Sequence, residues 1–294
     1  MNYAPVPELV ASCWTSAGDA APLRVPETSP VPIADRIEAL ASTGWAGFGL
    51  AHDDLVEAKS TLGFPALRKL IDEAGFRYVE VEFLSDWWDD SLSSSWRPKF
   101  DLLLEAAEVL GARFIKVGAA FGDALPDLGV LVEPLRRLTV EAVSRGTRIA
   151  LEPMAFSAVR SMPDAADLIR SVGMADCGLA VDYWHIFRHG TSLKELAKSL
   201  TADQIFAVEL NDADAEVRGT LFEDTRDNRR LCGMGDQDVT GFIATLQNLG
   251  FNGPWGVEIL SVEHRQLPVR EALQLAYSTA LTCFPASVAQ TQPA

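Results

Sequence analysis

The sequence predicts a single (β/α)8 barrel, the TIM-barrel fold, and two observations lead to this prediction. First, apolar runs of strand length alternate with amphipathic helical segments along the whole chain of 294 residues, about eight times. Second, four of the apolar runs stop at an acid: Glu152, Asp182, Glu209 and Glu258. In such a barrel the C-terminal ends of all strands face one pocket, so the fold would gather these four acids. The acids also help to set the strand register, which links the two observations.

The expected strands are short runs that are apolar almost throughout. This pattern is typical of strands in parallel sheets, because both of their faces are buried. The expected strands cover residues 9–13, 48–50, 77–83, 113–117, 148–152, 178–182, 204–210 and 255–259.

The expected helices place apolar residues on one face and mostly end at a glycine. In the first of them Ile33, Ile37 and Leu40 share a face, and Gly44 follows as a helix C-terminal glycine. The expected helices cover residues 33–41, 64–74, 98–110, 128–144, 163–172, a segment capped by Thr191 or Ser192 that runs to Leu200, 239–249 and 269–283.

The pattern indicates one barrel domain over residues 1–284, since no stretch has the composition of a linker. A long polar segment, residues 212–238, interrupts the alternation, and loops of that length are usually functional or disordered. Residues 285–294 are small and polar, and we expect a frayed tail there. A doubly wound open sheet is the alternative fold, but the chain has no glycine-rich dinucleotide fingerprint.

The composition of the chain argues against nucleic acids and membranes as partners. The chain has 25 basic and 41 acidic residues, and its net charge of −16 would repel a phosphate backbone, so we expect no nucleic-acid partner. It has no apolar run that would cross a bilayer and no signal-peptide pattern at residues 1–9, so we expect no membrane association. Cys13, Cys177, Cys232 and Cys283 lie far apart without C-x-x-C spacing, which fits a cytoplasmic location.

The four acids at strand ends predict a metal site. An unpaired buried carboxylate is costly, so four of them in one pocket need a cation, although each alone is also consistent with a solvated or ion-paired residue. Four oxygen donors form a hard site, and we expect one divalent ion, Mg²⁺ or Mn²⁺, because zinc prefers nitrogen and sulfur. The predicted metal ligands are therefore Glu152, Asp182, Glu209 and Glu258.

Other polar residues near strand ends are candidates for substrate binding. Lys116 ends the fourth strand, and Arg230 or its neighbour Arg229 lies on the long loop, where positive charge would offset the carboxylates. His52 follows the second strand, and Glu82 lies near the end of the third. Each has an ordinary alternative: a lysine that snorkels to solvent, a surface arginine, a capping histidine or an ion-paired acid.

Trp184 and His185 follow the acid of the sixth strand. An aromatic ring at a strand end can stack on the apolar face of a sugar, so Trp184 is a candidate substrate-binding residue, although tryptophan is also an ordinary core residue. His185 adds an imidazole close to Asp182 that can act in proton transfer. The chain has no G-x-S-x-G turn for a serine nucleophile and no Walker A loop.

A series of short motifs resembles the sugar phosphate isomerase/epimerase family of the xylose-isomerase-like TIM-barrel superfamily, and the resemblance covers nearly the whole chain. It implies that Glu152, Asp182, the residue at position 209 and Glu258 bind one divalent ion, that His185 touches the substrate, and that identical chains associate. The motifs are GLAHDDL at residues 49–55, LEP at 151–153, VDYWH at 181–185, LNDA at 210–213, GMGD at 233–236 and GPWGVE at 253–258.

Two positions depart from the pattern of the family. Relatives usually have His or Gln where this chain has Glu209, which bears on the ligand set and on the preferred metal. Many relatives have Pro-Gly-Glu-Gly where this chain has Cys-Gly-Met-Gly at residues 232–235, so the role of that loop does not carry over.

The chemistry of such a site favours an isomerase or epimerase acting on a keto sugar or related polyol. A metal bound to neighbouring carbonyl and hydroxyl oxygens acidifies the C–H between them and stabilises an enediolate. Glu152, Glu258 or His185 would take the proton and return it to the other face or to the neighbouring carbon. Expulsion of a β-hydroxyl would give dehydration instead, so a lyase acting on an inosose or 3-dehydroshikimate, as in some relatives, is the alternative.

Two functions from other classes stay open. A DNA-repair endonuclease shares the superfamily, but that branch uses many histidines, whereas this chain has only His52, His185, His189 and His264, together with strong negative charge. The other function is a catalytically silent sugar-binding barrel, since a fold alone does not establish activity.

Overall fold

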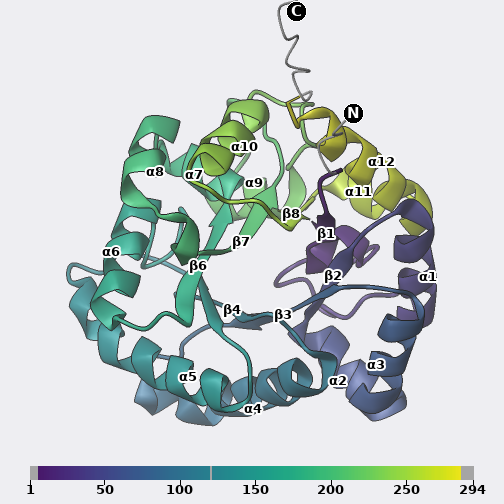
Figure 1. The fold of residues 1–294 in the computed structure, drawn as a ribbon, viewed down its shortest axis with the longest axis horizontal. Helices are drawn as coiled ribbons and strands as arrows, with labels where there is room; N and C mark the ends of the chain where they lie inside the picture. The colour runs from purple at the N-terminus through teal and green to yellow at the C-terminus, as the bar shows by residue number, and fades with distance from the viewer. Residues whose placement is uncertain (1–5, 120, 286–294) are drawn as a thin grey trace, which may run out of the picture.

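The computed structural model describes residues 6–119 and 121–285, and within them the chain forms the predicted closed barrel. The eight strands pair in parallel and in chain order, and β8 closes the ring against β1. Figure 1 shows the strands as a central ring surrounded by helices. The tail predicted to be frayed lies outside the described residues, except for Pro285. The strands are β1 (Leu9–Ala11), β2 (Gly47–Ala51), β3 (Tyr78–Leu84), β4 (Ile115–Gly118), β5 (Ile149–Glu152), β6 (Cys177–Asp182), β7 (Ile205–Leu210) and β8 (Trp255–Val257).

The helices cover the outside of the barrel, and several short ones lie at its carboxyl end. None of the described helices is both long enough and apolar enough to span a lipid bilayer. The helices are α1 (Ile33–Thr43), α2 (His52–Thr61), α3 (Phe64–Glu73), α4 (Ser93–Leu110), α5 (Val132–Ser144), α6 (Met162–Val172), α7 (Tyr183–His189), α8 (Leu193–Ser199), α9 (Leu221–Asp227), α10 (Val239–Asn248), α11 (Val262–Arg265) and α12 (Val269–Thr282).

The strand pattern explains why the acids face the interior. Side chains two residues apart in a strand point to the same side, so Ala150, Ala180 and Ala207 lie one layer below Glu152, Asp182 and Glu209. The three alanines are buried in one small cluster with Phe114 and Phe206. The acids therefore sit on an apolar floor at the carboxyl end of the barrel.

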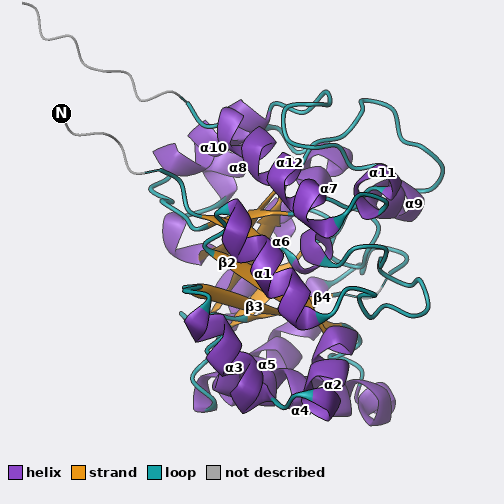
Figure 2. Ribbon diagram, turned by 90° about the vertical axis from the view of Figure 1, so that its right-hand side faces the viewer, coloured by secondary structure: helices purple, strands orange, loops and turns teal. Residues whose placement is uncertain are grey.

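The sequence analysis did not predict four of the helices: α2, α7, α9 and α11. The polar segment 212–238, predicted only as a loop, contains α9, which a capping box of Thr220 and Glu223 begins. β8 ends at Val257, so Glu258 follows the strand instead of lying within it. In Figure 2 the longer connections gather on the right, at the end of the barrel that also carries α9 and α11.

Candidate metal centre

The four predicted metal ligands meet at the carboxyl end of the barrel. Glu152 and Asp182 are the last residues of β5 and β6, Glu209 is the next-to-last residue of β7, and Glu258 directly follows β8. One carboxylate oxygen from each lies within 4.8 Å of the others, and all four side chains are buried. A buried group of carboxylates at this spacing has the donor chemistry of a hard cation site.

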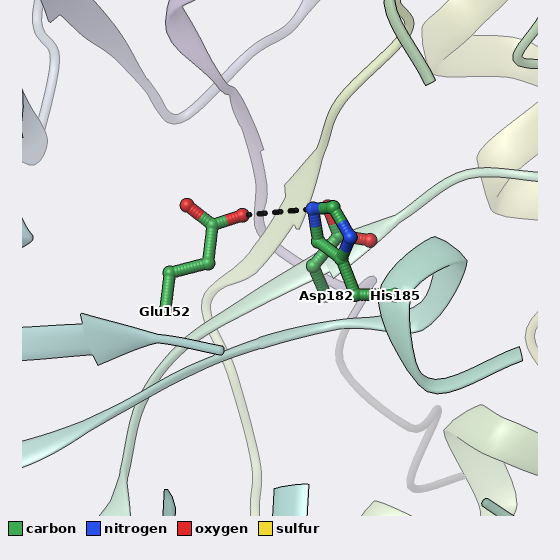
Figure 3. A group of neighbouring side chains, drawn as sticks. All are labelled: Glu152, Asp182 and His185. Atoms are coloured by element: carbon green, nitrogen blue, oxygen red, sulfur yellow. Dashed lines mark ion pairs between the residues drawn. The ribbon is translucent and has the colours of Figure 1, made fainter. Parts of the chain in front are cut away.

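His185 joins the acids because of how α7 begins. The Asp182 carboxylate caps this helix by accepting a hydrogen bond from the Trp184 N–H at 2.7 Å, which places His185 one turn further on. Its Nε2 lies 3.6 Å from Glu152 Oε1, the contact drawn in Figure 3, and 3.8 Å from Asp182 Oδ2.

The protonation state of His185 follows from its surroundings. Burial, against the opposing effect of Asp182, lowers the pKa of His185 to about 3, so the ring is neutral at neutral pH. Its Nδ1 accepts a hydrogen bond from the Ala155 N–H at 3.4 Å. A neutral imidazole that accepts at Nδ1 carries its proton on Nε2, so His185 offers an N–H donor to the carboxylates.

Lys116 supplies a buried positive charge to the acids. It lies in β4, and its Nζ is 2.6 Å from Glu82 Oε2 and 2.6 Å from Glu209 Oε1. The same atom is 3.8 Å from Glu152 Oε2 and 3.7 Å from Glu258 Oε1.

Arg229 supplies the second positive charge, from the connection between β7 and β8. Its Nη1 lies 2.8 Å from Asp182 Oδ2 and 2.9 Å from Glu258 Oε2. Its Nε and Nη2 both donate to the hydroxyl of Thr225 on α9. The guanidinium is fully buried and held from both sides.

These two cations do not neutralise the five carboxylates around them. Burial, followed by the repulsion of neighbouring acids, raises the pKa of Glu152 and Glu258 well above the ordinary value, and burial also raises the pKa of Glu209. Burial opposes ionisation of Asp182 as well, but Arg229 and the hydrogen bonds from Arg229 and Asn211 outweigh it and lower the pKa of Asp182 to about 2. Among the described residues, Glu209 Oε2 has no hydrogen-bond partner. The excess negative charge and this bare oxygen fit a divalent cation.

A cavity opens over the acids, with charged groups at its floor and aromatic rings on its wall. Glu152, Glu258, His185 and Arg229 line it together with His52, Glu82 and Lys116. His52 pairs with Asp53 at 2.9 Å and is partly exposed. The wall includes Phe121, Phe156 and Phe222, whose ring centroids lie 5.2 to 5.7 Å apart.

Two residues predicted to bind substrate lie elsewhere. Trp184 is fully buried and packs against Phe156 and under the Arg229 guanidinium, so it supports the cavity wall from behind. Arg230 is partly exposed and pairs with Asp214 at 3.0 Å. It is Arg229, named as the alternative, that enters the cavity. Asn228 and Arg230, on either side of Arg229, form isolated antiparallel bridges with Ser261 and Asp212.

The sequence did not indicate the aromatic wall. Phe121, Phe156 and Phe222 lie on three different connections, and phenylalanine in a loop carries no pattern that separates a wall residue from a core residue. Only their convergence in the folded barrel shows their place.

The chain is similar in sequence to proteins that are described as enzymes. The 3-dehydroshikimate dehydratase of Pseudomonas aeruginosa is 29% identical over 245 residues, which cover 80% of this chain and 37% of that protein. The chain thus spans little more than a third of that relative's length. The inosose isomerase of Bacillus velezensis is 24% identical over 218 residues, covering 71% of this chain and 69% of that protein.

Solved structures and a family model agree with the fold. An IOLI protein with a binding zinc atom superposes with a TM-score of 0.82 at 18% identity, covering 94% of this chain and 97% of that one. The 3-keto-D-glucoside 4-epimerase of E. coli superposes with a TM-score of 0.69 at 17% identity, covering 94% and 100%. The model of the xylose isomerase-like TIM barrel family matches residues 37–279, and the chain belongs to this family.

Proposed function

We propose that this protein is a metal-dependent isomerase or epimerase of a keto sugar or related polyol. The observation that carries the proposal is the set of four buried carboxylates within 4.8 Å, which lies beside a neutral His185 and of which Glu152 and Glu258 line a cavity. The alternative is a lyase that dehydrates a cyclic polyhydroxy ketone at the same site.

Glu152, Asp182, Glu209 and Glu258 would hold one divalent cation, and Mg²⁺ or Mn²⁺ suits four oxygen donors. Such an ion supplies positive charge that stabilises an oxyanion of the substrate. The protein residues then have separate tasks in moving the proton.

Glu152 and Glu258 both line the cavity and are the proposed proton acceptor and donor. In the ion-free protein, burial and neighbouring acids raise the pKa of both groups, and a bound cation would offset this effect. Removal of a proton next to a carbonyl leaves an enediolate, and return of the proton to the other face or to the neighbouring carbon gives the epimer or the isomer. His185, with its proton on Nε2, is proposed to hydrogen-bond the substrate oxygen where negative charge develops.

Two observations favour the lyase. The dehydratase relative is matched over 80% of this chain, and the wall of Phe121, Phe156 and Phe222 suits a flat ring. A planar unsaturated product would pack against such rings better than a puckered sugar would.

The first test is metal content, measured by mass spectrometry on the wild type and on the double variant Glu152→Gln, Asp182→Asn. About one divalent ion per chain, lost in the variant, supports the metal site. The absence of a bound ion in wild type after incubation with Mn²⁺ and with Mg²⁺ would overturn the mechanism and favour a sugar-binding barrel.

The second test separates the two reactions. Wild type and the double variant are incubated with keto sugars, inososes and 3-dehydroshikimate in heavy water. Deuterium uptake without loss of water supports the isomerase or epimerase. A product with a new ultraviolet absorption and a mass lower by one water supports the lyase.

A further inference from the structure

We infer that Lys116 is a positioning residue of the proposed metal centre: its ammonium binds one oxygen of Glu209 and leaves the other oxygen for the ion. The positive charge of the same ammonium weakens the binding of divalent cations. The inference rests on the metal site proposed above. It differs from the role in substrate binding that the sequence predicts for this lysine.

The Lys116 side chain spans the interior of the barrel. Lys116 on β4 is the register neighbour of Glu82 on β3, so their contact joins adjacent strands. Glu209 belongs to β7, and β5 and β6 separate β4 from β7 in the ring. The contact between Lys116 and Glu209 therefore crosses the barrel, and the lysine is 2% exposed. Its Nζ donates a hydrogen bond to Glu209 Oε1 at 2.6 Å and forms an ion pair with Glu82 Oε2 at 2.6 Å, and these two contacts restrict the head group.

The two oxygens of Glu209 have different surroundings. Oε1 accepts from Lys116 Nζ at 2.6 Å and from the Ser12 hydroxyl at 3.0 Å. Oε2 is buried and has no hydrogen-bond partner among the described residues. Because an unpartnered buried carboxylate oxygen is costly, Oε2 is the atom that a cation would satisfy.

Lys116 also lies close to other proposed ligands of the ion. Its ammonium is 3.7 Å from Glu258 Oε1 and 3.8 Å from Glu152 Oε2. A fixed positive charge this close to the ligand oxygens repels a divalent cation bound between them, and burial strengthens the repulsion because little water screens it. The same charge stabilises the ion-free protein. Loss of Lys116 should therefore tighten ion binding and destabilise the ion-free fold.

The test compares Lys116→Met with Lys99→Met, since Lys99 lines the same cavity but is exposed. The dissociation constant of Mn²⁺ is measured calorimetrically without substrate at one pH, and the midpoint of thermal unfolding is measured with and without Mn²⁺. We expect Lys116→Met to bind Mn²⁺ at least about tenfold more tightly than wild type. Its midpoint of thermal unfolding should be lower than that of wild type without Mn²⁺ and should rise more when Mn²⁺ is added. Lys99→Met should match wild type.

An unchanged or weaker Mn²⁺ affinity of Lys116→Met would overturn the inference and return Lys116 to a substrate contact. If Lys116→Met does not fold, the comparison of Glu82→Gln with the double variant Glu82→Gln, Lys116→Met carries the same test, because the unpaired Glu82 charge is then gone from both proteins. Failure of wild type to bind Mn²⁺ would instead overturn the proposed function.

Discussion

Arg229 and Arg230 are neighbours in the chain, yet they have opposite surroundings. Arg229 is fully buried between Asp182 and Glu258, whereas Arg230 is partly exposed beside Asp214. Removal of one partner from a buried ion pair leaves the other charge uncompensated and costs about 3–5 kcal/mol, whereas an exposed pair contributes about 0–1 kcal/mol.

We therefore expect Arg229→Gln to lower the free energy of unfolding by several times more than Arg230→Gln. Urea unfolding of the two variants at pH 7.5 without added metal checks this, with wild type as the reference. Equal losses would contradict the assignment of Arg229 to the buried cluster.

Glu80 is a buried acid whose Oε1 lies 3.6 Å from Arg113 Nη1. Burial, opposed by Arg113, raises its pKa from 4.5 to about 7. The folded state thus favours the protonated form, so the contribution of Glu80 to stability is full below pH 4.5 and is lost as the pH rises to 7. The size of this loss is about 3 kcal/mol.

Glu80→Gln should remove that pH dependence. We expect the variant to be more stable than wild type at pH 8 by up to about 3 kcal/mol, and the difference to vanish below about pH 4. Urea unfolding at a series of pH values measures it, with the exposed Glu73→Gln as control. A gain that is the same at every pH would show that the Glu80 charge is not its cause.

At the scale of elements, α9 begins with a capping box and carries residues that line the cavity. The Thr220 hydroxyl accepts from the Glu223 N–H, and the Glu223 carboxylate accepts from the Thr220 N–H in return. The helix carries Phe222 and Thr225, and Thr225 holds Arg229. The cap therefore helps to fix Arg229, a buried residue of the candidate metal centre.

Thr220→Ala should destabilise the protein by about 1 kcal/mol and speed amide hydrogen exchange over residues 221–227. The matched control is Ser192→Ala, which removes the same kind of capping box from α8. The control should lose similar stability while exchange in α9 stays unchanged. Unaltered exchange in α9 of Thr220→Ala would contradict this account.

The elements that the sequence predicted are those whose burial leaves a pattern. Strands buried on both faces read as apolar runs, and long helices have an apolar face. The helices α7, α9 and α11 were missed because they have 7, 7 and 4 residues, too few for a clear period. The helix α2 was missed because only two of its apolar residues, Leu55 and Ala58, are buried, so it has no continuous apolar face. The helix α8 also has 7 residues, but its cap at Thr191 or Ser192 predicted it. The four acids were predicted because an apolar strand that ends in a carboxylate is unusual. Contacts between connections that are distant in the sequence decide which of Arg229 and Arg230 points into the cavity, and they also bury Trp184. Such contacts leave no local pattern in the sequence.

At the scale of the whole molecule, Thr15 links the segments that follow the first and the last strand of the barrel, β1 and β8. Its hydroxyl donates to the Val257 carbonyl at 2.8 Å and accepts from the Ile259 N–H at 2.9 Å. Its own carbonyl lies 2.9 Å from His264 Nε2. These bonds reinforce the closure of β1 against β8, which joins residues from opposite ends of the sequence.

Thr15→Val keeps the shape of the side chain and removes both hydroxyl bonds. Two buried backbone groups then lose a partner, so we expect a loss of about 2–4 kcal/mol in the free energy of unfolding. Urea unfolding measures it, with the exposed Thr61→Val as control. A loss no larger than that of the control would show that the closure does not depend on Thr15.

The aromatic wall makes three connections of this barrel depend on one another. Phe121, Phe156 and Phe222 follow β4, β5 and β7, and each ring contacts the other two. The first two connections are also joined by a backbone bridge between Phe121 and Ser157. Barrels of this fold commonly acquire new specificities by changes in single loops on a constant frame. In this protein a graft of one of these loops would leave the other two without their packing surface, so redesign for a new substrate would have to exchange all three as one module.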